Sequence, residues 1–253
     1  MRQYPWRLKL VHEGRRYIRV ERKGRFFAFE PDSAFHEVGI LLGAEQERVS
    51  GLVRTAQSGR GEVVLSEQVA QGLGSLNGIT MHCFPVTVDG VLFEGMSYSP
   101  LLQPDRASGV LRMRHAIKSP RKAAKRWREN GESPNSEALT SVVQLTLPDG
   151  GRLVHLDLSL HQETPDEWIK EAQERFKGAD WLICGVEYGQ DDSVLAHIKG
   201  FESKVVLLAD LVNEQREAQG LPTNLLTPTV DALVEQGISA HPFPPKSSFR
   251  FER

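Results

Sequence analysis

The sequence predicts an α/β protein built as a four-layer αββα sandwich, with two sheets packed face to face and helices outside. The first thirty residues have the pattern of a β-meander, and short strand–helix units follow. The chain then returns to a hairpin and closes on further strand–helix units. Two successive β-then-α halves are typical of two sheets that pack together under helical layers. The 253 residues, 40% of them hydrophobic, are enough to bury such a core without disulfides.

The N-terminal half is predicted as the meander followed by strand–helix units. Runs rich in β-branched and aromatic residues, separated by the turns "EGR" and "KGR", predict the meander strands "WRLKLVH", "YIRVER" and "RFFAFEP". The run "VGILLG" predicts a short strand leading into a helix over about 45–56, whose apolar positions share one face. Further strands are predicted at "EVVLS", "ITMHCFPV" and "GVLFEG".

The C-terminal half is predicted as a hairpin followed by alternating helices and strands. The hairpin "SVVQLTLPDGGRLVHLDL" turns at residues 149–151, and the apolar runs "DWLICGV" and "KVVLLAD" predict buried strands. Helices are predicted over 165–176, 192–199, near 212–219 and over 228–236, before a strand at "SAHPF". Thr164 and Thr227 each precede a proline, so we expect their hydroxyls to cap two of these helices.

The cysteines and the apolar runs indicate the compartment. Cys83 and Cys184 are far apart and belong to no CxxC pair, so both are expected to be buried thiols of a reducing compartment. The N-terminus has no apolar run of signal-peptide length, and no window approaches a membrane span. We therefore expect a soluble cytoplasmic protein. The absence of GxSxG and P-loop sequences argues against serine hydrolases and P-loop NTPases.

The net charge of −2 hides an uneven distribution of charge along the chain. Residues 1–25 hold nine Lys or Arg against two acids, and residues 106–128 hold nine against none. The two segments thus contain 18 of the 31 basic residues of the chain but only two of its 33 acids. This pattern predicts a positive face on an otherwise acidic body.

The second basic segment is the strongest functional signal. A helix starting at Pro120 carries its cations in two stripes, with no acid near enough for intrahelical pairing. Such a face binds nucleic acid or another phosphate-bearing ligand by counterion release, and an aromatic residue serves as a stacking platform. The candidate ligand-binding residues are Arg112, Arg114, Arg121, Lys122, Lys125, Arg126, Trp127 and Arg128. The alternatives are a solvated helix, or one docked on the acidic body, an acidic protein partner or a second subunit.

In order and length the chain resembles the metallo-β-lactamase fold family. The stretch "VGILLGAEQERVSGL" is similar to the strand and helix start that carry the family's His-X-His-X-Asp-His motif. The stretch "GGRLVHLDL" resembles the strand that ends in the metal-bridging aspartate, here Asp157. The stretch "KVVLLADLVNE" resembles the late strand whose end supplies the last histidine, here Asp210. The resemblance implies one domain over 1–253, with a basic insertion at about 96–139 near the mouth of the pocket.

The resemblance also implies that the zinc motif is degenerate. Aligned on the helix start, the three motif histidines fall on Gly43, Glu45 and Arg48, and the motif aspartate falls on Glu47. The family's fourth histidine corresponds to His115. Zinc hydrolases need an imidazole-rich cage, and a permanent guanidinium charge inside it would repel a divalent ion. We therefore expect no zinc and no other cofactor.

The acids at the positions of the zinc motif allow two interpretations. They form an oxygen-rich set suited to Mg²⁺ or Mn²⁺, or Glu45 and Glu47 simply occupy the first turn of a helix, where its dipole favours acids. The fallback metal ligands are Glu45, Glu47, Asp157 and Asp210. The candidate catalytic residues are His115, His155 and Asp157, with a histidine as ligand or general acid. His155 and Asp157 lie two apart on one strand and so face the same side.

These observations predict a metallo-β-lactamase-like pseudoenzyme that acts by binding a phosphate-bearing ligand or nucleic acid. One alternative is a divergent, phosphodiesterase-like hydrolase with a carboxylate-rich Mg²⁺ or Mn²⁺ site. The other is a structural subunit of a larger assembly.

Overall fold

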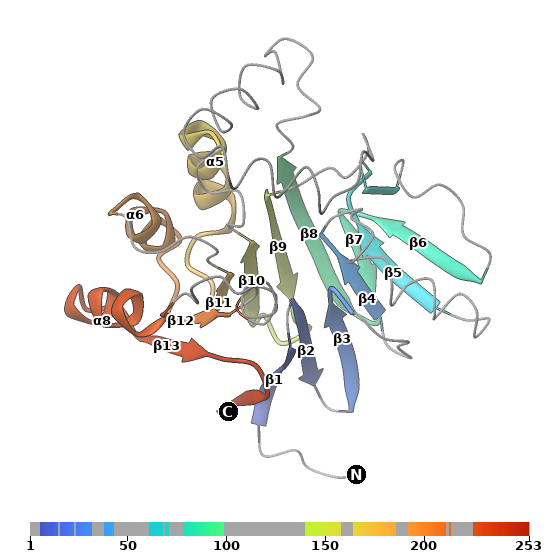
Figure 1. The fold of residues 1–253 in the computed structure, drawn as a ribbon. Coiled ribbons are helices and arrows are strands. Elements are labelled where there is room, and N and C mark those ends of the chain that lie inside the picture. The colour runs from blue at the N-terminus through green and yellow to red at the C-terminus, as the bar shows by residue number, and fades with distance from the viewer. Residues whose placement is uncertain are drawn as a thin grey trace, which may run out of the picture.

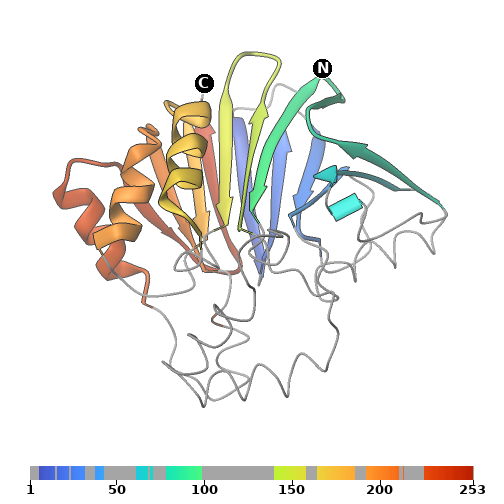
Figure 2. The same cartoon turned by 90° about the horizontal axis from the view of Figure 1, so that it is seen from above.

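The computed structural model describes residues 6–14, 16–22, 24–31, 38–42, 61–67, 69–70, 78–98, 140–157, 164–185, 192–210, 213 and 225–252. These residues form two seven-stranded sheets that pack face to face, and three helices cover the outer face of the second sheet (Figures 1 and 2). The predicted α/β class and the sandwich of two sheets are confirmed. The helices predicted over 45–56 and near 212–219 lie outside the described residues, apart from Asn213.

The first sheet combines the N-terminal meander with parallel strands. Its order is β14-β1-β2-β3-β4-β5-β6, antiparallel from β14 to β3 and parallel from β3 to β6. The strands are β1 (Trp6–Gly14), β2 (Tyr17–Arg22), β3 (Arg25–Phe29), β4 (Val38–Leu41), β5 (Gly61–Leu65), β6 (Ile79–Cys83) and β14 (Ser247–Glu252). Strand β14 was not predicted. It pairs with β1 and packs Phe249 and Phe251 against the core, so the last and first strands share one sheet edge.

The second sheet contains the hairpin and the C-terminal parallel strands, in the order β13-β12-β11-β10-β9-β8-β7. The strands are β7 (Val86–Val88), β8 (Val91–Tyr98), β9 (Thr140–Thr146), β10 (Arg152–Asp157), β11 (Trp181–Gly185), β12 (Val205–Ala209) and β13 (Ala240–Phe243). The helices are α5 (Asp166–Phe176), α6 (Asp192–Gly200) and α8 (Thr227–Glu235). None of these described helices combines the length and the apolar run that a membrane crossing needs.

Two local predictions are wrong. The stretch "ITMHCFPV" is not one strand, because it divides at Pro85 into β6 of the first sheet and β7 of the second. Proline has no N–H to donate to a ladder, so the chain changes sheets there. The predicted cap positions are also wrong: Pro165 and Leu226, not Thr164 and Thr227, occupy the N-cap positions of α5 and α8, and neither of these two N-cap side chains makes a cap hydrogen bond. The helix starts agree with the prediction to within one residue.

Alternation along β10 separates two cores. Leu153 faces the first sheet, in a core that contains an edge-to-face pair of Phe27 and Phe93 with ring centroids 5.5 Å apart. Val154 and Leu156 face the helices in a second core. Because side chains alternate along a strand, the last residue of β10, Asp157, faces inward, toward the first sheet. The fold thus directs a carboxylate to the edge where the sheets meet.

The position of Gly95 gives a test of the inter-sheet packing. A Cβ at Gly95 would lie 2.8 Å from Cδ2 of the Phe84 ring, which packs against the core between the sheets. We expect Gly95→Ala to lower the free energy of unfolding in urea by about 1–3 kcal/mol through overpacking. Adding Phe84→Leu should recover part of the loss, since the smaller side chain makes room for the methyl group. Strict additivity of the two substitutions would contradict this packing.

Candidate functional site

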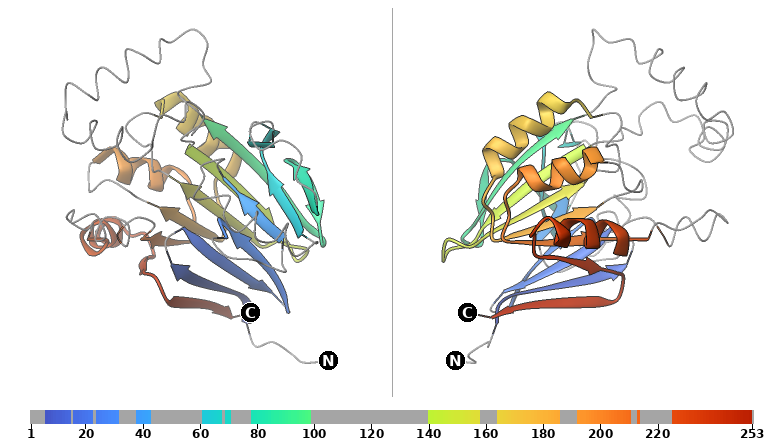
Figure 3. Two further views of the ribbon diagram at one scale, coloured as in Figure 1. Left: turned by 45° about the vertical axis from the view of Figure 1, so that its right-hand side comes forward. Right: turned by 90° about the vertical axis from the view of Figure 1, so that its left-hand side faces the viewer.

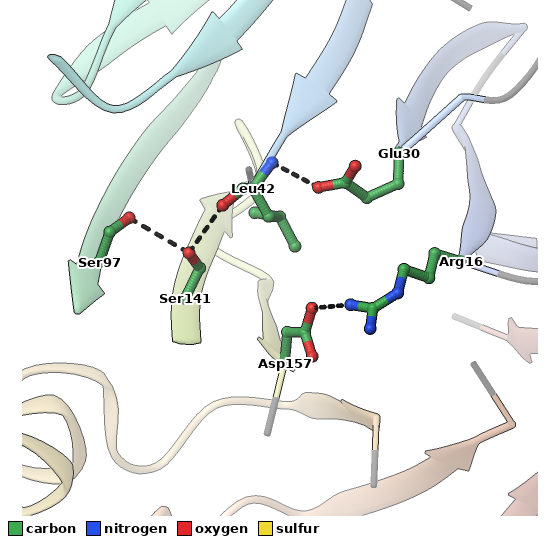
Figure 4. A network of polar contacts seen from close by, with 6 residues as sticks. All are labelled: Arg16, Glu30, Leu42, Ser97, Ser141 and Asp157. Atoms are coloured by element: carbon green, nitrogen blue, oxygen red, sulfur yellow. Dashed lines mark hydrogen bonds and ion pairs between the residues drawn. The ribbon is translucent and has the colours of Figure 1, made fainter. Parts of the chain in front are cut away.

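The candidate site lies at the edge where strand ends from both sheets meet. In the first sheet β3 runs parallel to β4, and in the second sheet β10, β11 and β12 run parallel to one another. Parallel strands of one sheet end at a common edge. Figure 4 shows side chains of both sheets in contact there: Arg16, Glu30 and Leu42 from the first sheet, and Ser97, Ser141 and Asp157 from the second. Ligands of α/β proteins bind at such edges, so this is the place where chemistry is expected.

Asp157 forms an ion pair that joins the two sheets. Its side chain is only 1% exposed, and its Oδ2 lies 2.5 Å from Nη1 of Arg16, which is 21% exposed. Arg16 lies in the turn between β1 and β2, where Gly14 pairs with Tyr17. Gly14 has φ = 144°, a conformation that glycine adopts without strain. The turn therefore directs the guanidinium of one sheet onto the carboxylate of the other.

Glu30 fixes the end of β4. It follows β3 with φ = 46°, its side chain is buried, and its Oε1 accepts a hydrogen bond of 2.5 Å from the backbone N–H of Leu42. Its own N–H donates to the carbonyl oxygen of Ile40. Sequence reasoning gave Glu30 no role at the site. An acid directly after the apolar run "RFFAF" was the available signal, because a buried strand end is an unfavourable place for a charge without partners.

Two serines join β8 and β9 to the end of β4. The buried hydroxyl of Ser141 donates to the carbonyl oxygen of Leu42 at 3.0 Å, and Ser97 Oγ lies 3.2 Å from Ser141 Oγ. Because the single proton of Ser141 goes to Leu42, Ser97 is the donor in the second bond. Both backbone polar groups of Leu42 are thereby held by side chains, the N–H by Glu30 and the carbonyl by Ser141 (Figure 4).

His155 faces the same way as Asp157 but lies inside the core. Its side chain is 1% exposed, and its ring stacks on Phe29 with centroids 4.5 Å apart. Cys184 is buried on the helix side of β11. Burial raises the pKa of the Cys184 thiol, and the negative charge of Asp157 raises it further, so the thiol stays protonated. Both cysteines are free, as expected, although Cys83 is only half-buried.

Asp210 performs a local structural task at the end of β12. Its Oδ1 accepts a hydrogen bond of 2.9 Å from the backbone N–H of Asn213, and its own N–H donates to the carbonyl oxygen of Phe243 at 3.4 Å. A bond to the N–H three residues on, at the helical Asn213, is the pattern of a helix N-cap. A role of Asp210 as a metal ligand stays a prediction.

The remaining predicted site residues lie outside the described residues. These are Glu45, Glu47, His115, Arg112, Arg114, Arg121, Lys122, Lys125, Arg126, Trp127 and Arg128. His115 and the basic residues belong to the segment 99–139, and the structure describes where it joins the fold: β8 ends at Tyr98 and β9 begins at Thr140, directly opposite in register. Ser97 and Ser141, next to these two residues, belong to the contacts of Figure 4. The segment 99–139 is thus attached to the site edge at both ends.

Several solved structures have a similar fold, and three of them are described as hydrolases. One, a novel metallo hydrolase from Ignicoccus hospitalis, superposes with a TM-score of 0.61 at 10% identity, covering 97% of this chain and 99% of that one. An isothiocyanate hydrolase from Delia radicum gut bacteria gives 0.59 at 12% identity, covering 96% and 99%. A possible metal-dependent hydrolase from Veillonella parvula gives 0.59 at 10% identity, covering 96% and 99%.

The chain has the metallo-β-lactamase fold. At identities this low the structural similarity establishes the fold and no more. No family model matches the sequence, and no curated protein sequence matches it either.

The described residues do not fit the metal centre that this fold implies. Nowhere in the described ranges do three His, Cys, Asp or Glu side chains gather closely enough to hold a metal ion. Asp157, which the resemblance predicts as the bridging aspartate, is paired with a guanidinium, and His155 packs in the core. A metal ion at Asp157 would have to displace Arg16 or lie beside its positive charge.

The first basic segment does not form a free positive face. Five of its nine cations make ion pairs: Lys9 with Glu21, Arg16 with Asp157, Arg19 with Glu13 and Glu21, Arg22 with Asp149, and Arg25 with Asp89. The side chains of the other four, Arg2, Arg7, Arg15 and Lys23, are not described. The expectation of a positive face therefore rests on residues 106–128.

The Ser141 hydroxyl can be tested directly. We expect Ser141→Ala to lower the free energy of unfolding by about 1–3 kcal/mol, because the carbonyl oxygen of Leu42 then loses its donor in a buried place. Ser248→Ala, at an exposed position of β14, is the matched control and should change stability by less than about 0.5 kcal/mol. Urea unfolding followed by circular dichroism measures both. Equal effects of the two variants would contradict the bridging role of Ser141.

Proposed function

We propose that this metallo-β-lactamase-fold protein is not a hydrolase and that it binds nucleic acid or another phosphate-bearing ligand through its basic segment. The proposed binding residues are Arg112, Arg114, Arg121, Lys122, Lys125, Arg126, Trp127 and Arg128. The observation that carries the proposal is the ion pair of Asp157 with Arg16. It places a fixed cation where a hydrolase of this fold would need a carboxylate free to bind metal.

The attachment of the basic segment supports the location of the ligand. Residues 106–128 carry nine cations and no acid, and the chain leaves and re-enters the sandwich at the site edge, at Tyr98 and Thr140. The described cations of the first basic segment pair either with its own two glutamates or with aspartates of the second sheet, whereas residues 106–128 contain no acid. A segment rich in cations and without acids attracts phosphates, and binding them releases counterions.

Nucleic-acid binding should depend steeply on salt. We expect a fluorescein-labelled single-stranded oligonucleotide to bind with an affinity that falls by roughly a hundredfold or more between 50 and 200 mM salt. Replacing Arg121, Lys125 and Arg128 by Gln should weaken binding at least tenfold and lower the salt slope by about two to three, as each lost phosphate contact reduces it by about one. Fluorescence anisotropy measures both quantities.

The matched control replaces three exposed lysines elsewhere, Lys170, Lys177 and Lys199, by Gln. This change removes the same charge from α5, its C-terminal end and α6. We expect less than a threefold effect on affinity, because these lysines lie outside the proposed binding segment. Weak, salt-independent binding by the unmodified chain, or equal losses in the two triple variants, would refute nucleic acid as the ligand.

A divergent metal-dependent hydrolase is the second candidate function. It is favoured by two of the structural neighbours, which are described as metal-dependent hydrolases. In this version Asp157, Asp210, Glu45 and Glu47 would hold Mg²⁺ or Mn²⁺, with His115 or His155 as ligand or general acid. Those metals prefer oxygen ligands, but the carboxylate of Asp157 would first have to leave Arg16.

Metal content and turnover distinguish the two functions. For protein purified without a metal-affinity tag, we expect elemental analysis to find well below one equivalent of Zn, Mn, Fe or Mg. We expect no hydrolysis of bis-p-nitrophenyl phosphate above the buffer rate with 1 mM MnCl₂ added. One bound equivalent together with turnover that Asp157→Asn abolishes would establish the hydrolase instead.

A further inference from the structure

We infer that Arg16 is a built-in counter-cation: it neutralises Asp157 and joins the two sheets in the place of an exchangeable metal ion. This inference rests on the non-hydrolytic half of the proposed function, and it is independent of any nucleic acid. It assigns Arg16 a positioning role at the edge of the sandwich.

The surroundings of Asp157 make a cation necessary. It ends β10 between two neighbouring strands, opposite Ser141 of β9 and Gly185 of β11, and is 1% exposed. On the far side of the sheet, Leu156 and Cys184 belong to the apolar core under the helices. An ionised carboxylate in such a place is strongly unfavourable unless a charge partner and hydrogen bonds compensate for the lost water.

Arg16 supplies that charge from within the fold. It comes from the opposite sheet and is about four-fifths buried, and its Nη1 is 2.5 Å from the carboxylate. The turn that carries it is fixed by the pairing of Gly14 with Tyr17 and of His12 with Ile18. A guanidinium stays protonated at all ordinary pH values and cannot dissociate from the chain. In both respects it differs from a metal ion, whose occupancy depends on concentration and on chelators.

Hydrogen bonds beside the ion pair also hold the two sheets together at this edge. Ser141 of the second sheet donates to the carbonyl oxygen of Leu42 in the first. At the end of β13, Nδ1 of the buried His12 donates to the carbonyl oxygen of Phe243 at 2.8 Å. Two other described ion pairs, Arg22 with Asp149 and Arg25 with Asp89, also join the sheets, but their carboxylates are exposed, whereas that of Asp157 is buried. Removing only the cation should therefore be worse than removing both charges.

A double-mutant cycle tests the inference. Arg16→Met, Asp157→Asn and the double variant are compared by thermal unfolding in 1 mM EDTA. We expect Arg16→Met to lower the melting temperature by roughly 10 °C, and the double variant to recover at least half of that loss. If Arg16→Met gives no folded protein while the double variant folds, the expected ranking holds. Arg16→Lys, which keeps the charge but not the planar fork, should fall between the parent and Arg16→Met.

The pair of Arg25 and Asp89 is the matched control. It has the same chemistry, with Nη1 2.6 Å from Oδ1, but its side chains are 54% and 52% exposed. Arg25→Met should shift the melting temperature by no more than about 2 °C, because exposed pairs contribute little. An Arg16→Met variant as stable as the double variant, or no less stable than Arg25→Met, would overturn the role of Arg16.

Zinc titration of the unmodified protein separates this inference from the proposed function. We expect no saturable heat on calorimetric titration with ZnCl₂ or MnCl₂, and no change of melting temperature when EDTA is added. Stoichiometric zinc uptake that stabilises the protein would overturn both the inference and the non-hydrolytic function. Absence of zinc together with a flat mutant cycle would overturn only the counter-cation and leave the proposed function standing.

Discussion

A carboxylate buried at the meeting edge of two sheets needs a positive charge, and the identity of that charge decides what the edge can do. In this chain the charge on Asp157 is met by Arg16 of the opposite sheet. The neighbouring strand ends are held by neutral hydrogen bonds that use both backbone polar groups of Leu42. Because these partners are side chains and backbone of the same chain, the arrangement forms with the fold itself. A metal centre would add a second requirement, namely supply of the ion.

Most of the fold was predictable because its strongest signals are local. The parallel strands β11 and β12 are buried on both faces and therefore read as continuous apolar runs. The errors occurred where a tertiary choice overrides the local pattern. Pro85 sends one apolar stretch into two sheets, and β14 becomes a strand because β1 offers it an open edge. Which strand of a sheet has an unpaired edge depends on the tertiary structure. The pairing of β14 with β1 could therefore not be predicted from the sequence.

The candidate site divides in the same way. Asp157 was predictable from its place at the end of a hairpin strand, and its inward direction follows from alternation. Arg16 was not, because 141 positions separate it from its partner and it lies among other cations. A cluster of arginines in sequence suggests a positive surface, yet the fold distributes them among acids of distant turns such as Asp89 and Asp149. Charge density along a chain therefore predicts a charged surface only where the three-dimensional partners are absent.

The contrast between paired and unpaired cations bears on the second basic segment, residues 106–128. The charges of the hairpin cations are compensated because strand register and turns place acids beside them. Glu21, for example, lies opposite Lys9 and pairs with it. Residues 106–128 carry no acid of their own, and their segment is attached through Tyr98 and Thr140 to an edge whose carboxylates, Glu30 and Asp157, already have hydrogen-bond or ion-pair partners. Acids that are engaged within the fold are poor partners for further cations, since a second cation gains little from a charge already compensated. The proposed function rests on this contrast: we propose that the positive charge of residues 106–128 serves to bind an external polyanion.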